Sequence, residues 1–286
     1  MAPKVAPVRA LGNTPVAAPA GPAAWRRGAE IPTVTALPYP ATQTTAKNPL
    51  TKPERMPRLV VFDCDGTLVD SQHLIAEAMA GAFAAAGEPA PEPGRVRRVV
   101  GLSLAEAVAE LLGQGDGEQG AGVGAVEAIV GHYRRRFAEL RRGPHHEPLF
   151  PGAVAALDAL EGGGFLLGVA TGKSLRGLTA TLSRHRLERR FVTLQTADRG
   201  PGKPHPAMLE RAIAEAGTAP ERSVLVGDTS FDMEMAGNAG VAAIGVSWGY
   251  HEAAELEAAG AGAVIASFAE LAPLVARMLA EAAPAR

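Results

Sequence analysis

The sequence has little of what a disulfide-stabilised, membrane-spanning or nucleic-acid-binding protein needs. Cys64 is the only cysteine among 286 residues, so no intrachain disulfide can form and a reducing compartment is expected. No apolar run approaches the roughly 20 residues that a membrane span needs. A formal net charge of −2 gives no overall attraction to nucleic acid or to an anionic membrane. We therefore expect a cytoplasmic protein with neither a membrane nor a nucleic acid as partner.

The first part of the chain lacks apolar periodicity. Residues 1–55 are rich in proline and show no sustained helical or strand pattern. Such a segment cannot bury enough apolar surface to offset the entropy cost of ordering it. We expect residues 1–55 to be a disordered extension that plays no part in the chemistry.

Short apolar runs and helical patterns alternate along the rest of the chain. The runs predict strands at 58–62, 165–170, 191–195, 223–227, 241–246 and 263–266, and the periodic segments predict helices near 152–161, 174–187, 205–217, 230–239, 252–259 and 268–282. Strands that are apolar throughout and separated by helices are typical of a parallel sheet covered on both faces. The sequence predicts a doubly wound α/β core made of residues 56–70 and 149–286.

Residues 71–148 interrupt this alternation with helical patterns and no strand. The patterns cover 71–86, 103–112 and 125–142, and the glycine-rich stretch 113–124 predicts a mobile loop. Because the insert follows the first strand, it lies at the carboxyl edge of the sheet, where open α/β folds bind ligands. We expect an all-helical cap domain above a site at that edge.

Polar residues gather after four of the predicted strands. Asp63 and Asp65 follow the first strand, "ATGKS" with Thr171 ends the second, and Lys203 lies in "GKPHP" after the third. "GDTSFD", with Asp228 and Asp232, follows the fourth. These groups converge if the strands are parallel neighbours, and the carboxylates then repel one another unless a cation lies among them. Hard oxygen ligands favour Mg²⁺.

Such a site favours phosphoryl transfer. A metal, a lysine and the amides at a helix start together bind a dianion, for which phosphate is the obvious candidate. One carboxylate can attack phosphorus, and the second can act first as acid and then as base. The spacing of Asp63 and Asp65 places both on the same side of an extended chain, so that they can address one reacting group.

Four motifs carry a resemblance to a known family. "DCDGTLVDS", "ATGKS", "GKPHP" and "GDTSFDMEMAGNAG" resemble, in order and spacing, the motifs of the haloacid dehalogenase superfamily, and most closely its phosphoglycolate-phosphatase-like branch with a helical cap. The resemblance covers about residues 58–270. It implies that Asp63 is the nucleophile and that Asp65 is the general acid/base, whose backbone carbonyl also binds Mg²⁺.

The resemblance also implies how the ligands are bound. Thr171 and the Gly172 amide hold the transferring phosphoryl group, and Lys203 neutralises charge on that group and on Asp63. Asp228 is a direct Mg²⁺ ligand, while Asp232 acts on the metal directly or through water. The implied metal site is therefore Asp63, Asp65, Asp228 and Asp232.

We thus expect a Mg²⁺-dependent phosphatase that hydrolyses a small phosphorylated metabolite through an aspartyl-phosphate. One alternative is a phosphosugar mutase of the same superfamily, in which Arg97 or Arg98 could hold a second phosphate. Another is a catalytically silent binding module on the same fold, although such a module needs none of the acidic and lysine residues above. The sequence makes no prediction of the oligomeric state.

Several other features have ordinary structural interpretations. "HYRRRFAELRR" (132–142) is expected to be a solvated cap face rather than a nucleic-acid site, and His205 a helix-start residue. Lys173 is more typical of a surface lysine than of a ligand-binding one, and Cys64 has a packing role. "SWGY" (247–250) either lines the entrance of the site or packs under the cap.

Overall fold

The computed structural model describes residues 56–113, 123–143 and 147–281. The predicted extension 1–55 and most of the predicted glycine-rich loop lie outside the described residues. The strands are β1 (Arg58–Phe62), β2 (Phe165–Thr171), β3 (Phe191–Thr196), β4 (Ser223–Gly227), β5 (Ala242–Val246) and β6 (Ala263–Ile265). Each lies where an apolar run predicts it, to within one residue at either end.

The six strands form one parallel sheet in the order β3-β2-β1-β4-β5-β6. The chain adds β2 and β3 on one side of β1 and then crosses over to add β4, β5 and β6 on the other. The boundary between β1 and β4 is therefore the switch point, at whose carboxyl end ligands bind in open α/β sheets. The prediction of a doubly wound α/β core is confirmed.

Helices cover both faces of the sheet, which explains why its strands are apolar throughout. The core helices are α5 (Ala153–Gly162), α6 (Leu175–Arg184), α7 (Ala207–Ala216), α8 (Ser230–Asn238), α9 (Ala253–Ala258) and α10 (Leu271–Glu281). Successive residues of β1 point to opposite faces. Val60 and Phe62 pack with residues of α5, α6 and α10. Leu59 and Val61 pack with residues of α7, α8 and α9. Both faces are thus buried.

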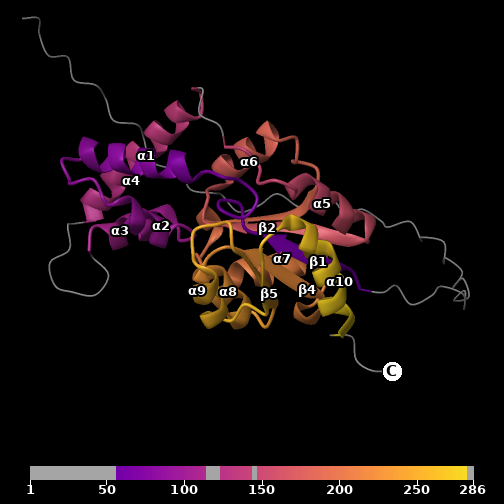
Figure 1. Cartoon of the computed structure of the whole chain (residues 1–286). Coiled ribbons are helices and arrows are strands. Elements are labelled where there is room, and N and C mark those ends of the chain that lie inside the picture. Colours follow the sequence, from indigo (N-terminus) through magenta and orange to yellow (C-terminus); the bar gives the residue numbers. More distant parts are fainter. Residues whose placement is uncertain (1–55, 114–122, 144–146, 282–286) are drawn as a thin grey trace, which may run out of the picture. The chain divides into compact units, whose positions relative to one another are not determined.

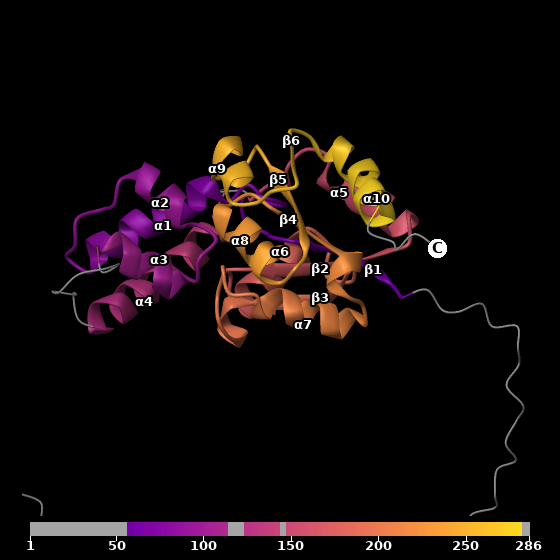
Figure 2. The same ribbon diagram turned by 90° about the horizontal axis from the view of Figure 1, so that it is seen from below.

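The segment between β1 and β2 forms four helices with an apolar cluster of their own. They are α1 (Gln72–Ala85), α2 (Pro93–Val99), α3 (Leu104–Leu111) and α4 (Val123–Leu140). Met79, Phe83, Val108 and Ile129 are among the buried residues of this cluster. Figures 1 and 2 both show α1–α4 gathered on one side of the sheet.

The two connections between sheet and insert run side by side. Asp70 donates its backbone N–H to the carbonyl of Pro148 (2.9 Å), and Phe150 donates its own to the carbonyl of Leu68 (3.0 Å). Val69 and Leu149 form an antiparallel bridge between these bonds. The chain therefore leaves and re-enters the core through one paired two-segment connection.

Helix α2 is the element that sequence reasoning missed. It has only seven residues, PGRVRRV, with a glycine and two β-branched valines that disfavour a helix. Pro93 at its first turn was the available signal, because proline is favoured there. Helix α4 begins at Val123, two residues before the predicted start at 125. None of the helices in the described part of the chain is long and apolar enough to cross a membrane.

Candidate active site

Asp63 lies at the carboxyl end of β1, at the switch point of the sheet. Its backbone N–H donates to the carbonyl of Val226 in β4 (2.9 Å), which continues the strand pairing by one residue. Its side chain is buried, and one carboxylate oxygen accepts the backbone N–H of Cys64 (2.6 Å). Cys64 itself is buried in the apolar core, which agrees with its predicted packing role.

A tight turn after Asp63 brings the ends of β1 and β4 into contact. Gly66 adopts φ +85°, and a Cβ atom at this position would lie 2.1 Å from a carboxylate oxygen of Asp228. Only glycine fits this close approach. The turn also places the Thr67 hydroxyl where it donates to Asp228 (2.6 Å). Asp228 is held further by the backbone N–H of Tyr250, which donates to its other oxygen (2.9 Å).

Three of the predicted carboxylates form a compact buried cluster. Asp63, Asp228 and Asp232 each contribute an oxygen, and these oxygens lie within 4.8 Å of one another. Burial raises the pKa of Asp63 from 3.8 to about 6, and the positive charge of Lys203 acts against this rise. Burial and the carboxylates of Asp63 and Asp232 raise the pKa of Asp228 well above its usual range. A divalent cation would relieve this cost, so the residues present fit a metal ion.

Lys203 is a buried cation beside the cluster. Its Nζ lies 2.9 Å from Asp63 Oδ2 and 2.6 Å from Asp232 Oδ1, with its side chain fully shielded from solvent. Burial alone would lower the pKa of Lys203, but the carboxylates of Asp232 and Asp63 raise it above its ordinary value. Lys203 is therefore charged, and one positive charge balances part of the negative charge of three aspartates.

The start of α8 holds Asp232 in place. Asp232 accepts the backbone N–H of Thr229 (3.1 Å) and the Thr229 hydroxyl (2.7 Å), while its own N–H donates back to that hydroxyl (3.3 Å). These reciprocal hydrogen bonds form a capping box, which gives partners to backbone N–H groups at the start of α8. One carboxylate oxygen is thereby used for capping, and the other faces Lys203.

Thr171 and Gly172 lie at the end of β2, where the helical insert covers them. A Cβ atom at Gly172 would lie 2.4 Å from the carbonyl oxygen of Leu102 and 2.8 Å from that of Gly101. The loop before α3 therefore rests directly on this part of the core. Ser174 caps α6 by accepting the N–H of Gly177 (3.3 Å). Ser174 and Gly177 line the cavity described below, while the N–H of Leu175, the first residue of α6, donates to the carboxylate of Asp198 (3.1 Å).

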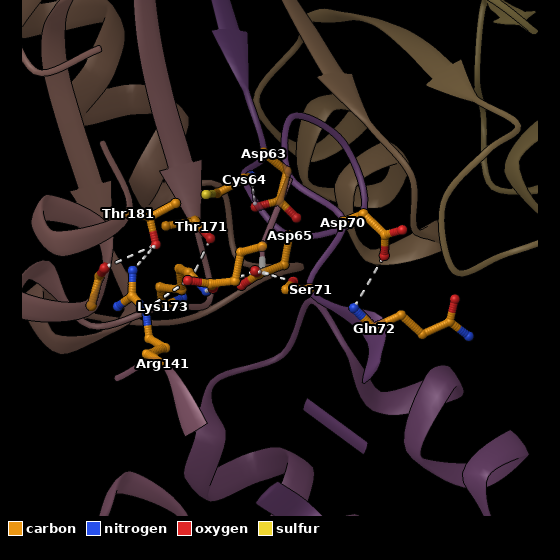
Figure 3. A network of polar contacts seen from close by, with 12 residues as sticks. Asp63, Cys64, Asp65, Asp70, Ser71, Gln72, Arg141, Thr171, Lys173 and Thr181 are labelled. Atoms are coloured by element: carbon orange, nitrogen blue, oxygen red, sulfur yellow. Dashed lines mark hydrogen bonds and ion pairs between the residues drawn. The ribbon is translucent and has the colours of Figure 1, made fainter. Parts of the chain in front are cut away.

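Asp65 is not part of the carboxylate cluster, and its side chain points toward Lys173, as Figure 3 shows. Its Oδ1 lies 2.7 Å from Lys173 Nζ and also accepts a hydrogen bond from the Ser71 hydroxyl. The ring of Phe137 lies 5.2 Å from the same ammonium. Burial would lower the pKa of Lys173, but the carboxylate of Asp65 raises it. The interpretation of Lys173 as a surface lysine is wrong, because its side chain is only 10% exposed.

Glu147 extends this network and was missed by sequence reasoning. Its side chain is fully buried, with Oε2 2.6 Å from Nε of Arg141 and Oε1 3.8 Å from Nζ of Lys173. Arg141 also donates to the Thr181 hydroxyl on α6 (3.1 Å). A buried chain of charges therefore runs from Asp65 through Lys173 and Glu147 to Arg141. No motif indicated it, because a glutamate in a proline-flanked loop is usually exposed.

We expect Glu147→Gln to destabilise the fold strongly. The amide keeps the shape of the side chain but leaves Arg141 without its buried counter-charge, and breaking a buried ion pair typically costs about 3–5 kcal/mol. The melting temperature should fall by roughly 10 °C for a chain of this size. Differential scanning calorimetry measures this, with Glu110→Gln on the exposed side of α3 as the control. Equal melting temperatures for both variants would contradict the argument.

A cavity of about 890 Å³ opens between the insert and the core. Asp63, Asp65, Thr171, Gly172 and Lys173 lie on its core side. The side formed by the insert is largely apolar, and exposed arginines of α4 and α6 also line the cavity. The structure thus brings the predicted nucleophile, acid/base and phosphate-binding residues to one cavity, with Lys203 directly behind Asp63.

The remaining predicted features divide between packing and surface roles. In "SWGY", Tyr250 is buried with residues of the insert, whereas Trp248 packs against the core cluster beside Phe268. His205 accepts the N–H of Ala207 (3.2 Å), as a helix-start residue does. Arg97 donates to the carbonyls of Gly249 and Tyr250, and the Arg98 side chain is 79% exposed. Neither arginine lines the cavity.

The fold and this site define an α/β protein with a cluster of buried carboxylates at the carboxyl edge of its sheet, beneath a helical insert. A model of the haloacid dehalogenase-like hydrolase family matches residues 60–246. The chain belongs to this family.

Curated relatives agree with the family. The chain is 35% identical over 217 residues to "Probable phosphatase IndB" of Dickeya dadantii, covering 76% of this chain and 92% of that protein. It is 31% identical over 198 residues to "Phosphoglycolate phosphatase 1" of Pseudomonas aeruginosa, covering 69% and 72%. It is also 33% identical over 202 residues to "Tyrosine-protein kinase PtkA" of Mycobacterium tuberculosis, covering 70% and 66%.

A solved structure agrees with the fold. A hydrolase from Pseudomonas syringae superposes with a TM-score of 0.69 at 24% identity, covering 77% of this chain and 98% of that one. The prediction of a phosphoric monoester hydrolase of this family is confirmed by the family match together with the phosphatases among the relatives.

Proposed function

We propose that the chain is a Mg²⁺-dependent phosphatase that hydrolyses a small phosphorylated metabolite through a phospho-Asp63 intermediate. The observation that carries the proposal is the position of Asp63. It lies at the switch point of the sheet, 2.9 Å from a buried lysine and within the carboxylate cluster, at the base of a cavity. In this proposal residues 71–148 are the cap, and residues 56–70 with 149–286 are the catalytic core.

The first half-reaction forms the intermediate. A carboxylate oxygen of Asp63 attacks phosphorus as the bond from phosphorus to the ester oxygen breaks. Thr171 and the Gly172 N–H bind the phosphoryl oxygens, and Lys203 balances their charge. Asp65, in its protonated form, gives its proton to the departing alkoxide. The alcohol is released, and Asp63 carries the phosphoryl group.

The second half-reaction restores the enzyme. Asp65, now ionised, takes a proton from a water molecule that attacks phosphorus, and the bond to Asp63 breaks. Inorganic phosphate leaves, Asp63 is again a free carboxylate and Asp65 again carries a proton. Asp63, Asp228, Asp232 and the backbone carbonyl of Asp65 would hold Mg²⁺, which supplies charge stabilisation of the phosphoryl oxygens.

Turnover of p-nitrophenyl phosphate tests the proposal directly. The full chain should release p-nitrophenol in the presence of Mg²⁺ and lose this activity on chelation. A panel of phosphorylated metabolites then ranks candidate substrates by kcat/KM. Absence of turnover on every ester, with Mg²⁺ bound, would favour the silent binding module instead.

We expect Mg²⁺ to stabilise the protein more at neutral than at acidic pH. The pKa of Asp63 is raised to about 6 by burial, so the folded metal-free protein holds this proton more tightly than the unfolded chain. The contribution of Asp63 to the stability of the metal-free protein therefore falls as the pH rises from 3.8 to about 6, where Asp63 becomes ionised. A bound cation removes this penalty only where Asp63 is ionised.

Thermal shift assays check this expectation. At about pH 7.5, saturating Mg²⁺ should raise the melting temperature by several degrees, and at about pH 5 by much less. Asp228→Asn should abolish the effect, whereas Asp70→Asn, a substitution outside the cluster, should retain it. A Mg²⁺ effect that is equal at both pH values would contradict the assignment of the cluster.

A further inference from the structure

The rim of the cavity carries an excess of positive charge that the proposed chemistry does not use. Arg134 and Arg135 on α4, Arg142 just beyond it, and Arg176 and Arg184 on α6 all line the cavity. They come from both sides of the opening, from the insert and from the core. The prediction that 132–142 is only a solvated cap face is therefore incomplete, because part of this face borders the cavity.

These five arginines have no carboxylate within 4.0 Å among the residues that the structure describes. The acidic residues that line the cavity have their closest partners elsewhere. Asp63 and Asp65 pair with the two lysines. Asp198 accepts the backbone N–H of Leu175 and the Thr196 hydroxyl, and Glu139 lies nearest to Arg136.

The wall that the insert contributes to the cavity is largely apolar. Met79, Val96, Leu102, Tyr133 and Phe137 line it, and the last two rings stack with centroids 5.6 Å apart. The volume of about 890 Å³ is in the upper part of the range of about 300–1,000 Å³ that holds drug-sized ligands. A two-carbon phosphate ester would fill only a small part of it and would contact neither wall nor rim fully.

We propose that the natural substrate is an organic phosphomonoester with an extended apolar or aromatic body and a second anionic group, which the rim arginines of α4 and α6 bind. This inference rests on the proposed function, since it places the transferred phosphate at Asp63. The body lies along the apolar wall, and the second anion lies at the rim. Guanidinium groups suit this role because they bind carboxylate and phosphate with two parallel hydrogen bonds.

Matched pairs of synthetic esters test the proposal. Phenyl phosphate is compared with 4-carboxyphenyl phosphate, and biphenyl-4-yl phosphate with 4′-carboxybiphenyl-4-yl phosphate. The full chain should favour the carboxylated member by at least about tenfold in kcat/KM in the longer pair, and by less in the shorter one. Raising the salt concentration should weaken this preference, because the arginines are exposed.

A double variant identifies the residues responsible. Arg135→Gln with Arg176→Gln removes one rim charge from each helix and should raise KM for the carboxylated biphenyl ester by about tenfold with kcat unchanged. Phenyl phosphate should be hydrolysed as by the unaltered protein. The matched control, Arg98→Gln with Arg189→Gln, removes two exposed arginines that do not line the cavity and should change neither ester.

Binding of non-hydrolysable phosphonate analogues of the biphenyl pair, measured by calorimetry, separates the two proposals. The same preference in Kd without turnover of any ester would refute the phosphatase and support the rim site. Turnover of phenyl phosphate with no preference in kcat/KM or Kd would refute the rim site alone. An equal loss in the control variant, or a 5′-phosphorylated oligonucleotide hydrolysed in preference to every small ester, would also overturn the inference.

Discussion

Asp63→Asn should abolish phosphatase activity, lowering kcat by more than about 10⁴-fold for every ester that the unaltered protein hydrolyses. The amide nitrogen and the neutral amide oxygen of asparagine are far weaker nucleophiles than a carboxylate. No other carboxylate can replace it, because Asp228 and Asp232 are held by Thr67, Tyr250 and Thr229. The loss should therefore be the same for alkyl and aryl phosphates.

The fold should survive this substitution. Asparagine can still accept the backbone N–H of Cys64 through its side-chain oxygen. Lys203 retains Asp232 at 2.6 Å, so no buried cation is left without a partner. One of three mutually repelling carboxylates is removed, and the melting temperature of the metal-free protein should not fall.

A control variant shows whether the loss of activity is specific to Asp63. Asp70→Asn makes the same chemical change seven residues along the chain, where the side chain is only weakly bonded to the N–H of Gln72 (3.4 Å). Its activity should match that of the unaltered protein. Activity in Asp63→Asn at the level of Asp70→Asn would remove Asp63 from the chemistry and refute the proposed intermediate.

The sheet could be predicted from the sequence because its strands are buried on both faces. A strand such as "RLVVF" must be apolar throughout when helices cover both sides, and this leaves a run that no amphipathic helix shows. Helix α2 could not be predicted in this way. Its seven residues bury only Val96 and Val99, too few to show a period. Helix α2 is stabilised by packing against the rest of the insert, and not by intrinsic helix propensity.

Part of the site could be predicted for a topological reason. The carboxyl ends of neighbouring parallel strands share one edge, so Asp63 and Asp228 had to be near each other once the sheet was assigned. The pairing of Lys173 with Asp65 could not be read in the same way. It depends on Glu147 and Arg141 being buried together where the insert rejoins the core. Such packing of side chains from distant segments leaves no local pattern in the sequence.

The scarcity of lysine in the sequence nonetheless indicated that Lys173 and Lys203 belong to the site. Lys173 and Lys203 are the only lysines after Lys52, and the structure places both beside an aspartate of the first motif. Lys203 is next to Asp63 and Lys173 is next to Asp65. Each of the two aspartates therefore has its own cation.

Asp65→Asn should separate the tasks proposed for Asp63 and Asp65. Asparagine cannot donate a proton to a leaving alkoxide or take one from water, and general acid–base help is worth roughly 10²–10⁴-fold. Alkyl phosphates, whose leaving groups need protonation, should be slowed by this full factor at the first step. The leaving group of an aryl phosphate is a stable phenolate that needs little protonation, so the phosphoenzyme should still form quickly from aryl esters.

The second step should be slow for both kinds of ester, because water then lacks its base. An aryl phosphate should therefore give an early burst of phenol, with phosphorylated protein visible by intact-mass spectrometry. The fold should remain, since asparagine can still accept from Ser71 and Lys173 keeps Glu147 as a counter-charge at 3.8 Å. Asp70→Asn should show neither burst nor slowing. If alkyl and aryl esters lost rate equally in Asp65→Asn and no phosphoenzyme accumulated, Asp65 would not be the general acid/base, and its pairing with Lys173 would have only a structural role.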